Sequence, residues 1–189
     1  MIGMPRNRAL PNVPRWARIA ATGAALTNVP SALWRTALAV GVPVGLGQSE
    51  YDTMDVPGQG TFFLIGISVL SEIFAVLALG LVRGWGEIWP RWVPFLRGRR
   101  VPVLLATALA GFGTLATTVY GVLFVYTTFH AHMEATNWGI WLLNAVYAPL
   151  LLWGPLLGLA TVHYYRRRTA PQAPSPAARP SRVAPATAA

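Results

Sequence analysis

Long apolar stretches separated by short polar segments dominate this chain. Residues 61–82 form a run in which Glu72 is the only ionisable side chain, and apolar residues occupy all faces of the helix that the run would form. Residues 101–127 and 139–165 are also long, predominantly apolar runs. A helix rises about 1.5 Å per residue, so each run can cross a hydrocarbon core of about 30 Å. We predict a transmembrane helix in each, because an all-round apolar helix does not suit a water-facing surface.

A fourth apolar segment, residues 19–44, is interrupted by Pro30 and Arg35. The parts before and after Arg35 are each too short to span a bilayer, but joined they are long enough. We therefore predict one crossing that bends near Pro30 and carries Arg35 into the membrane. The predicted fold is an all-α membrane protein, with a domain at 19–165 in which four transmembrane helices form an up-down bundle.

The charged residues are unevenly divided among the polar segments. Fourteen of the 15 arginines lie in the N-terminal tail 1–18, the middle loop 83–100 and the C-terminal tail 166–189, whereas the other two loops hold four acids and no arginine. Basic residues are enriched in cytoplasmic segments, so we expect both termini and the middle loop on the cytoplasmic side of the cytoplasmic (inner) membrane. The C-terminal tail, rich in proline and alanine, is predicted to be disordered.

The composition supports this class and excludes several others. Hydrophobic residues make up 54% of the chain and charged residues 11%, far fewer charges than soluble domains carry. The absence of cysteine excludes disulfides and thiolate metal sites, and the lysine-free, arginine-rich usage is typical of a high-GC bacterial genome. The membrane topology accounts for the net charge of +9, so no nucleic-acid partner is required.

Motifs for soluble-type catalysis and for metal binding are missing. The sequence contains no phosphate-binding P-loop, no GXSXG nucleophile motif and no dinucleotide fingerprint after a strand. His130 and His132 are two residues apart, a spacing that does not place both side chains on one face of a helix, and HEXXH is absent. We expect no cofactor and no metal site.

The two buried charges are the most specific signal in the sequence. Arg35 is nine residues from Val44, about 13 Å from the outer end of its crossing, and Glu72 is eleven residues from Thr61, about 16 Å from the outer end of the next. Consecutive antiparallel helices are usually neighbours, so we hypothesise a buried Arg35/Glu72 pair near the membrane centre. The pair would either fix the register of two helices, the commoner case, or take part in proton, ion or substrate handling.

Other polar residues are placed to extend this pair into a cluster. Helical spacing puts some on the face of Arg35, others on the face of Glu72, and two more at similar depths on the third and fourth crossings. In that order they are Asn28 and Ser31, Ser68 and Ser71, and Tyr120 and Asn144. Such stripes would form either a lined cavity or a closed hydrogen-bonded seam, and seams are more common.

The middle loop is too polar to span the membrane and too aromatic for a free loop. Its tryptophans and arginines suit the lipid interface, where they would anchor the loop and contact anionic headgroups. The candidate lipid-surface residues are Trp85, Trp89, Trp92, Arg97, Arg99 and Arg100.

Small residues recur at four-residue spacing on the last two crossings. Gly113, Thr117 and Gly121 follow one another on the third, and Gly154 and Gly158 on the fourth. This spacing lets helix backbones approach closely, so we expect a tight helix contact along each series.

Three segments carry a family likeness: ALTNVPSALWR from Ala25, SEIFAVLALGLVRGWGE from Ser71 and PRWVPFLRGRRVP from Pro90. The chain resembles small four-span integral membrane proteins of actinobacteria that have no assigned activity. The likeness covers the first three crossings and the middle loop. It implies the same architecture and no particular chemistry.

Three functions are compatible with these features. The favoured one is a small accessory or organising membrane component without catalysis of its own, which forms a homo-oligomer or joins a larger complex. The first alternative is a proton- or ion-linked transporter or channel in which Glu72 titrates. The second is a membrane-embedded enzyme acting on a lipid or isoprenoid, with Glu72 as catalytic acid in the manner of a terpene cyclase, although Arg35 beside it would favour the ionised carboxylate, which has no proton to donate.

Overall fold

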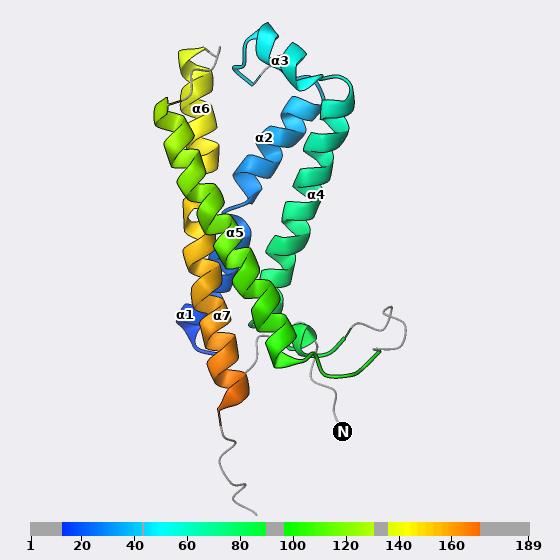
Figure 1. Ribbon diagram of the computed structural model, residues 1–189, viewed down its shortest axis with the longest axis vertical. Helices are drawn as coiled ribbons and strands as arrows, with labels where there is room; N and C mark the ends of the chain where they lie inside the picture. Colours follow the sequence, from blue (N-terminus) through cyan, green and yellow to red (C-terminus); the bar gives the residue numbers. More distant parts are fainter. Residues whose placement is uncertain (1–12, 43, 90–96, 131–135, 171–189) are drawn as a thin grey trace, which may run out of the picture.

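The computed structural model describes residues 13–42, 44–89, 97–130 and 136–170, and within these ranges the only regular secondary structure is helical (Figure 1). The helices are α1 (Arg15–Leu26), α2 (Val29–Ala39), α3 (Gln48–Met54), α4 (Gln59–Gly80), the 3₁₀ turn η1 (Gly84–Glu87), α5 (Val103–His130), α6 (Asn137–Tyr147), the 3₁₀ turn η2 (Ala148–Leu152) and α7 (Trp153–Thr169).

Among the residues that the structure describes, three helical stretches are long and apolar enough to cross a membrane. They are α4, α5 and the continuous stretch Asn137–Thr169, which comprises α6, η2 and α7. Within the last stretch Pro149 has no N–H to donate, and the backbone there tightens into the 3₁₀ turn η2. The chain is therefore an all-helical protein of membrane type, with these three helices as candidate spans.

The first apolar segment differs from the predicted bent helix because it is divided into two helices. α1 ends at Leu26, and α2 begins at Val29 with Pro30 in its first turn. Pro30 has no N–H with which to bond the carbonyl four residues back, so the α-helical ladder is interrupted there. The two helices have 12 and 11 residues, and neither is long enough alone to count as a span.

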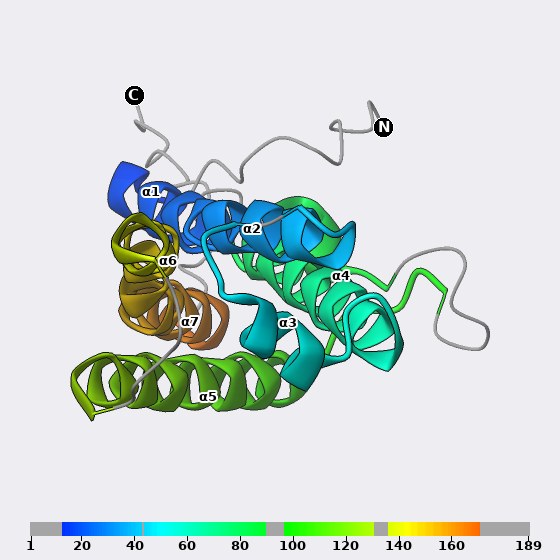
Figure 2. The same ribbon diagram turned by 90° about the horizontal axis from the view of Figure 1, so that it is seen from above.

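Seen from above, the helices follow an open curve that runs from α4 through α1 and α7 to α5 (Figure 2). α5 packs on η2 and α7, α1 lies between α7 and α4, and α2 lies against α4 and α6. α4 and α5 follow each other in the sequence but make little contact. The connection 81–102 is long enough for α5 to pack away from α4. The small residues of α5 allow it to pack against α7 instead.

Glycines bring α5 and α7 close together, in agreement with the small-residue spacing. A Cβ added at Gly154 would lie 3.0 Å from the backbone nitrogen of Thr118, and one at Gly158 would lie 3.1 Å from Cγ2 of Thr114. Gly121 faces Leu151 across the same contact. Because glycine has no side chain, the backbones of α5 and α7 can lie this close together.

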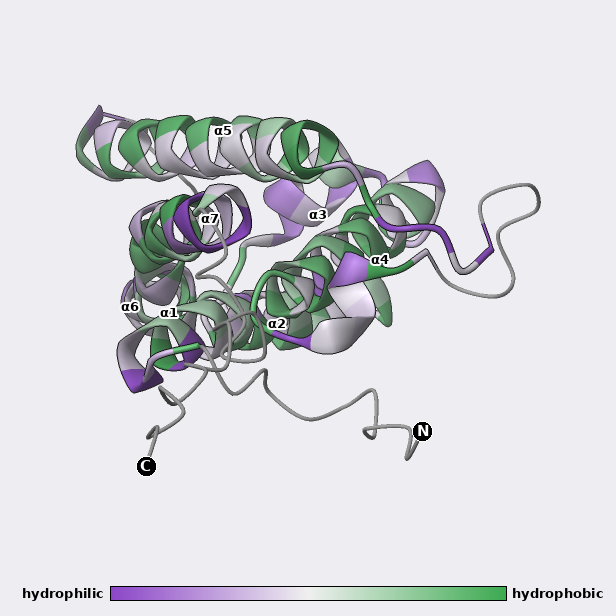
Figure 3. Cartoon of the chain, turned by 90° about the horizontal axis from the view of Figure 1, so that it is seen from below, coloured by the Kyte–Doolittle hydropathy of each residue, from purple (hydrophilic) through white to green (hydrophobic). Residues whose placement is uncertain are grey.

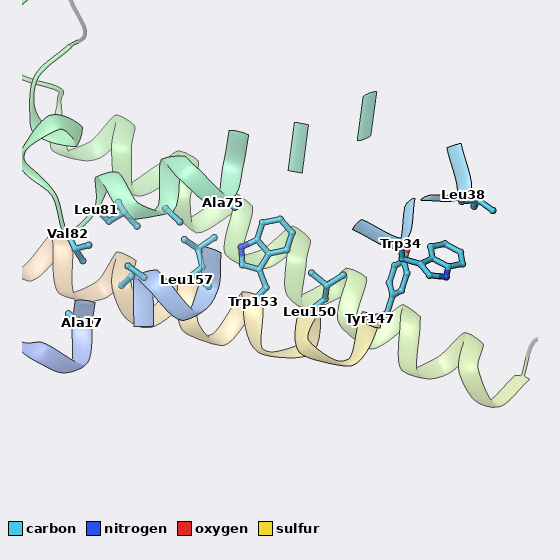
Figure 4. Close-up of a cluster of buried hydrophobic side chains, with 14 of the residues drawn as sticks. Ala17, Trp34, Leu38, Ala75, Leu81, Val82, Tyr147, Leu150, Trp153 and Leu157 are labelled. Atoms are coloured by element: carbon cyan, nitrogen blue, oxygen red, sulfur yellow. The ribbon is translucent and has the colours of Figure 1, made fainter. Parts of the chain in front are cut away.

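Alanines fill the contact of α1 with α4 and α7, and larger side chains fill the middle of the molecule. Ala17, Ala21 and Ala24 are fully buried. Figure 4 shows Trp153 between Leu150 and Leu157 in the central cluster. The core is therefore narrow, and most large apolar side chains of α4 and α5 lie outside it.

The two ends of the molecule differ in charge. The start of α1, η1, the start of α5 and the end of α7 lie at one end, while α3, the end of α5 and the start of α6 lie at the other (Figure 1). Figure 3, seen from the first end, shows hydrophilic residues at the end of α7 and in the segment before α5. We call the first the arginine end. We call the second the acidic end, because α3 and its C-cap carry Glu50, Asp52 and Asp55.

Candidate functional site

The inner face of the α2 segment carries three buried polar residues. Asn28, Ser31 and Arg35 are spaced three and four residues apart, so they lie on one side of the helix. Their exposed fractions are 1%, 0% and 7%. The predicted polar stripe of the first crossing therefore turns inward, toward α4.

Arg35 is held by two serines of α4. Its Nε donates to the Ser68 hydroxyl over 3.0 Å, and its Nη2 donates to the Ser71 hydroxyl over 3.1 Å. Ser68 and Ser71 are one turn apart on α4, which places both hydroxyls within reach of one guanidinium group. The buried cation thus has direct hydrogen bonds but only neutral acceptors in these contacts.

Asn28 links this contact to the carboxylate. Its Nδ2 donates to the Ser71 hydroxyl over 3.1 Å and to Oε1 of Glu72 over 2.8 Å. The described residues contain no direct Arg35–Glu72 ion pair, so the hypothesised contact is replaced by a bridged one. The bridge has two members: the Ser71 hydroxyl accepts from Arg35 and from Asn28, and Asn28 donates to Glu72.

The hydrogen bonds of this network run in one direction. All four contacts between the helices are donated by Asn28 and Arg35 and accepted on α4. The serine protons go to backbone carbonyls, from Ser68 to Leu64 and from Ser71 to Ser68. Ser31 belongs to the cluster through its bond to the Asn28 carbonyl. The network is a hydrogen-bonded seam between two elements.

Aromatic side chains cover the other side of Arg35. Tyr147 is buried, interacts electrostatically with Arg35, and lies edge-on to Trp34 and stacked on Phe124. The sequence analysis missed Tyr147, although its place three residues after Asn144 on the same crossing was a usable signal. Tyr120 interacts with both Arg35 and Tyr147 but is 45% exposed and has no hydrogen bond within the described residues.

Asn144 lies outside the hydrogen-bonded cluster. Its Nδ2 donates to the Ile140 carbonyl of its own helix, and its Oδ1 accepts a long bond of 3.4 Å from Thr128 on α5. Of the eight predicted cluster residues, hydrogen bonds therefore join six, Tyr120 lies nearby, and Asn144 connects α6 to α5.

Glu72 is partly exposed, in contrast to Arg35. Its side chain lines an open groove of about 370 Å³ between α2 and α4, which we call the α2/α4 groove. The groove is lined by Ala32, Thr36, Ser68, Val69, Glu72, Ile73 and Val76. One carboxylate oxygen is bonded to Asn28, and the groove gives access to the carboxyl group from outside the bundle.

At the arginine end, Glu87 connects the middle loop to α7. Its two carboxylate oxygens lie 2.7 Å from Arg167 and 3.2 Å from Arg168, and both guanidinium groups also lie over the ring of Tyr164. The sequence analysis did not single out this triad. Glu87 could have been noticed as the only acid in the three arginine-rich segments.

The candidate lipid-surface residues have different environments. Trp85 packs against Gly80 at the end of α4, and Trp89 forms backbone hydrogen bonds with Arg99 and Gly98. Arg97, Arg99 and Arg100 are exposed, whereas Trp92 lies outside the described residues. The described part of the loop is therefore a paired segment packed on α4, with three arginines available at the surface.

Metal ligands are not assembled in the part of the chain that the structure describes. No group of three histidine or acidic side chains is close enough to hold a metal ion there, and His132 falls outside the described ranges. His130 contacts the carbonyl of Tyr126, one turn back on its own helix.

Comparison with known proteins gives no family, no curated protein and no solved structure that matches the chain. The resemblance to small actinobacterial membrane proteins stays a prediction.

Proposed function

We propose that this chain is a multi-pass protein of the cytoplasmic membrane with four crossings and both termini in the cytoplasm. α1 and α2 together would form the fourth crossing. In support, α1 contacts α4 and α7, α2 contacts α4 and α6, and α2 places Arg35 against the middle of α4. The arginines gathered at one end favour that end as the cytoplasmic side.

Single-cysteine labelling tests the topology cleanly because the chain has no cysteine of its own. A membrane-impermeant maleimide should label Gln48→Cys at the acidic end in intact cells. It should label Ala170→Cys at the arginine end only after the membrane is permeabilised. Labelling of both variants in intact cells would contradict an even number of crossings with cytoplasmic termini.

Its role in this proposal is that of an accessory or organising component, which acts by assembling with copies of itself or other membrane proteins. The observation that carries this role is the exposure of α4 and α5. Only 17% and 6% of their most apolar stretches are buried, and the two helices scarcely contact each other. Spans with so little internal packing leave large faces for lipid or for helices of a partner.

Photocrosslinking from α5 tests this role. A photoreactive residue at Phe112, which is 72% exposed, should give a discrete crosslinked protein in native membranes. The matched control is Leu33 on α2, which is 67% exposed. A single monomeric species from Phe112 in native membranes and in mild detergent would refute the assembly role.

A second candidate function is proton- or ion-linked transport through Glu72. The observation in its favour is the partial exposure of Glu72 in the α2/α4 groove, since a carboxyl group within a membrane protein commonly marks an ion or proton path. Flux into proteoliposomes that is lost in Glu72→Gln would support transport. Flux that is unchanged by this substitution would remove Glu72 from the pathway.

A further inference from the structure

The α2/α4 groove has a donor and acceptor pattern that limits what it can bind. Its polar lining consists of Thr36, Ser68 and Glu72. The Thr36 hydroxyl donates to the Ala32 carbonyl over 2.8 Å, and the Ser68 hydroxyl donates to the Leu64 carbonyl over 2.7 Å. A carboxylate has no proton to donate. The side chains of the groove therefore offer acceptors only, and a ligand has to bring the hydrogen-bond donor.

The Glu72 carboxylate has capacity left for such a donor. Its Oε1 accepts from Asn28 at 2.8 Å, while its Oε2 has no hydrogen bond to any residue that the structure describes. An ionised carboxylate can accept about four hydrogen bonds. Because the side chain is partly exposed on the groove, the free oxygen is reachable from outside the bundle.

The charge balance of the network disfavours stable binding of a cationic ligand. Arg35 is 7% exposed and has no direct ion pair among the described residues, so Glu72 is the nearest counter-charge in its network. The two are joined through Ser71 and Asn28. A second cation at Glu72 would leave one positive charge unbalanced in a medium of low dielectric constant, where this is costly. The ligand should be neutral.

We propose that the α2/α4 groove binds an uncharged, lipid-soluble alcohol or phenol. Its hydroxyl donates to the free oxygen of Glu72, and its apolar part lies against Val69, Ile73 and Val76. The volume of about 370 Å³ falls at the low end of small-molecule pockets and accommodates a ring or a short length of chain. This goes beyond the assembly role and rests on the proposed topology only in placing the groove within the bilayer.

A matched pair of probes tests the donor requirement on the full-length protein in lipid nanodiscs. One probe is a long-chain alcohol with a photoactivatable diazirine near the hydroxyl, and the other is its methyl ether. The alcohol should label peptides of α2 and α4 about fivefold more than the ether, the factor expected for one hydrogen bond of about 1 kcal/mol. Equal labelling by the two probes would overturn the proposal.

Two substitutions locate the site without touching Arg35 or Glu72. Ala32→Leu fills the α2/α4 groove and should remove most of the labelling by the alcohol. Val122→Leu makes the same kind of change in the shallow groove between α5 and η2, and should leave labelling as in the wild type. Thermal unfolding of each variant shows that it is folded. Undiminished labelling of folded Ala32→Leu would overturn the proposal.

The other occupant of such a groove would be a helix from a second copy. Ile65→Cys reports on this, because Ile65 is 44% exposed one helical turn before Val69, does not line the groove, and would be the one cysteine of the chain. Under mild oxidation the cysteine variant should remain a monomer, and its labelling by the alcohol should be retained. A disulfide-linked dimer together with loss of labelling would assign the groove to a protein contact and overturn the proposal, while leaving the assembly role intact.

Discussion

Arg35 donates a hydrogen bond of 3.1 Å to the hydroxyl of Ser71, and this contact takes the place of a direct ion pair with Glu72. The same hydroxyl accepts from Asn28 at 3.1 Å, and Asn28 also donates to Glu72, so Ser71 and Asn28 together connect the buried cation to its carboxylate. This bridge links the two charges through neutral side chains. It also leaves one carboxylate oxygen free for the α2/α4 groove.

Ser71→Ala should lower the free energy of unfolding by about 1–3 kcal/mol, because it removes the acceptor of two partly buried donors. Unfolding in mixed micelles, followed by tryptophan fluorescence, measures the change. Thr127→Ala is the matched control, since the exposed Thr127 hydroxyl bonds only to the Phe124 carbonyl of its own helix. Equal stability of the two variants would show that the bridge contributes nothing.

Glu72→Ala should lower the yield of folded protein and destabilise it by about 3 kcal/mol, because Arg35 is then a buried cation without a counter-charge. The double substitution Arg35→Leu with Glu72→Leu should recover much of the loss, since no charge is left unbalanced. Yield from membranes and the midpoint of unfolding measure both effects. A single variant as stable as the wild type would show that the two charges are not coupled.

Gly154→Val should separate α5 from α7 and cost about 1–3 kcal/mol, because its side chain would overlap Thr118. Gly111→Ala on α5 is the control, as a Cβ there meets nothing within 4 Å. The distance between spin labels on the two helices checks the separation. If both variants keep the wild-type distance and stability, the close glycine contact is not required.

Glu87→Gln should loosen the C-terminal turn of α7, because the two arginines that bind Glu87 then lose their charged partner. The pairs are only partly exposed, and we expect a loss of about 1 kcal/mol. Faster trypsin cleavage at Arg167 and Arg168 in the folded protein is the direct measurement. Asp52→Asn at the acidic end serves as the charge-matched control and should leave the cleavage rate unchanged.

The hydropathy pattern alone determined where the long apolar helices lie in the sequence. The runs 61–82, 101–127 and 139–165 correspond closely to α4, α5 and Asn137–Thr169, because in lipid a backbone must satisfy its own hydrogen bonds and an apolar run of this length does so as a helix. The face shared by Asn28, Ser31 and Arg35 also followed from the sequence, since helical periodicity fixes which residues lie side by side.

Only the tertiary structure decided which helices are neighbours and which polar atoms meet. Nothing in the sequence of α4 and α5 shows that they diverge, because that depends on how tightly the glycines of α5 and α7 fit together. Likewise, two opposite charges at equal depth predict attraction but not the partner of each hydrogen bond. Ser71, one residue before Glu72, is closer to the guanidinium group of Arg35, and an ångström-scale difference of this kind is set by packing.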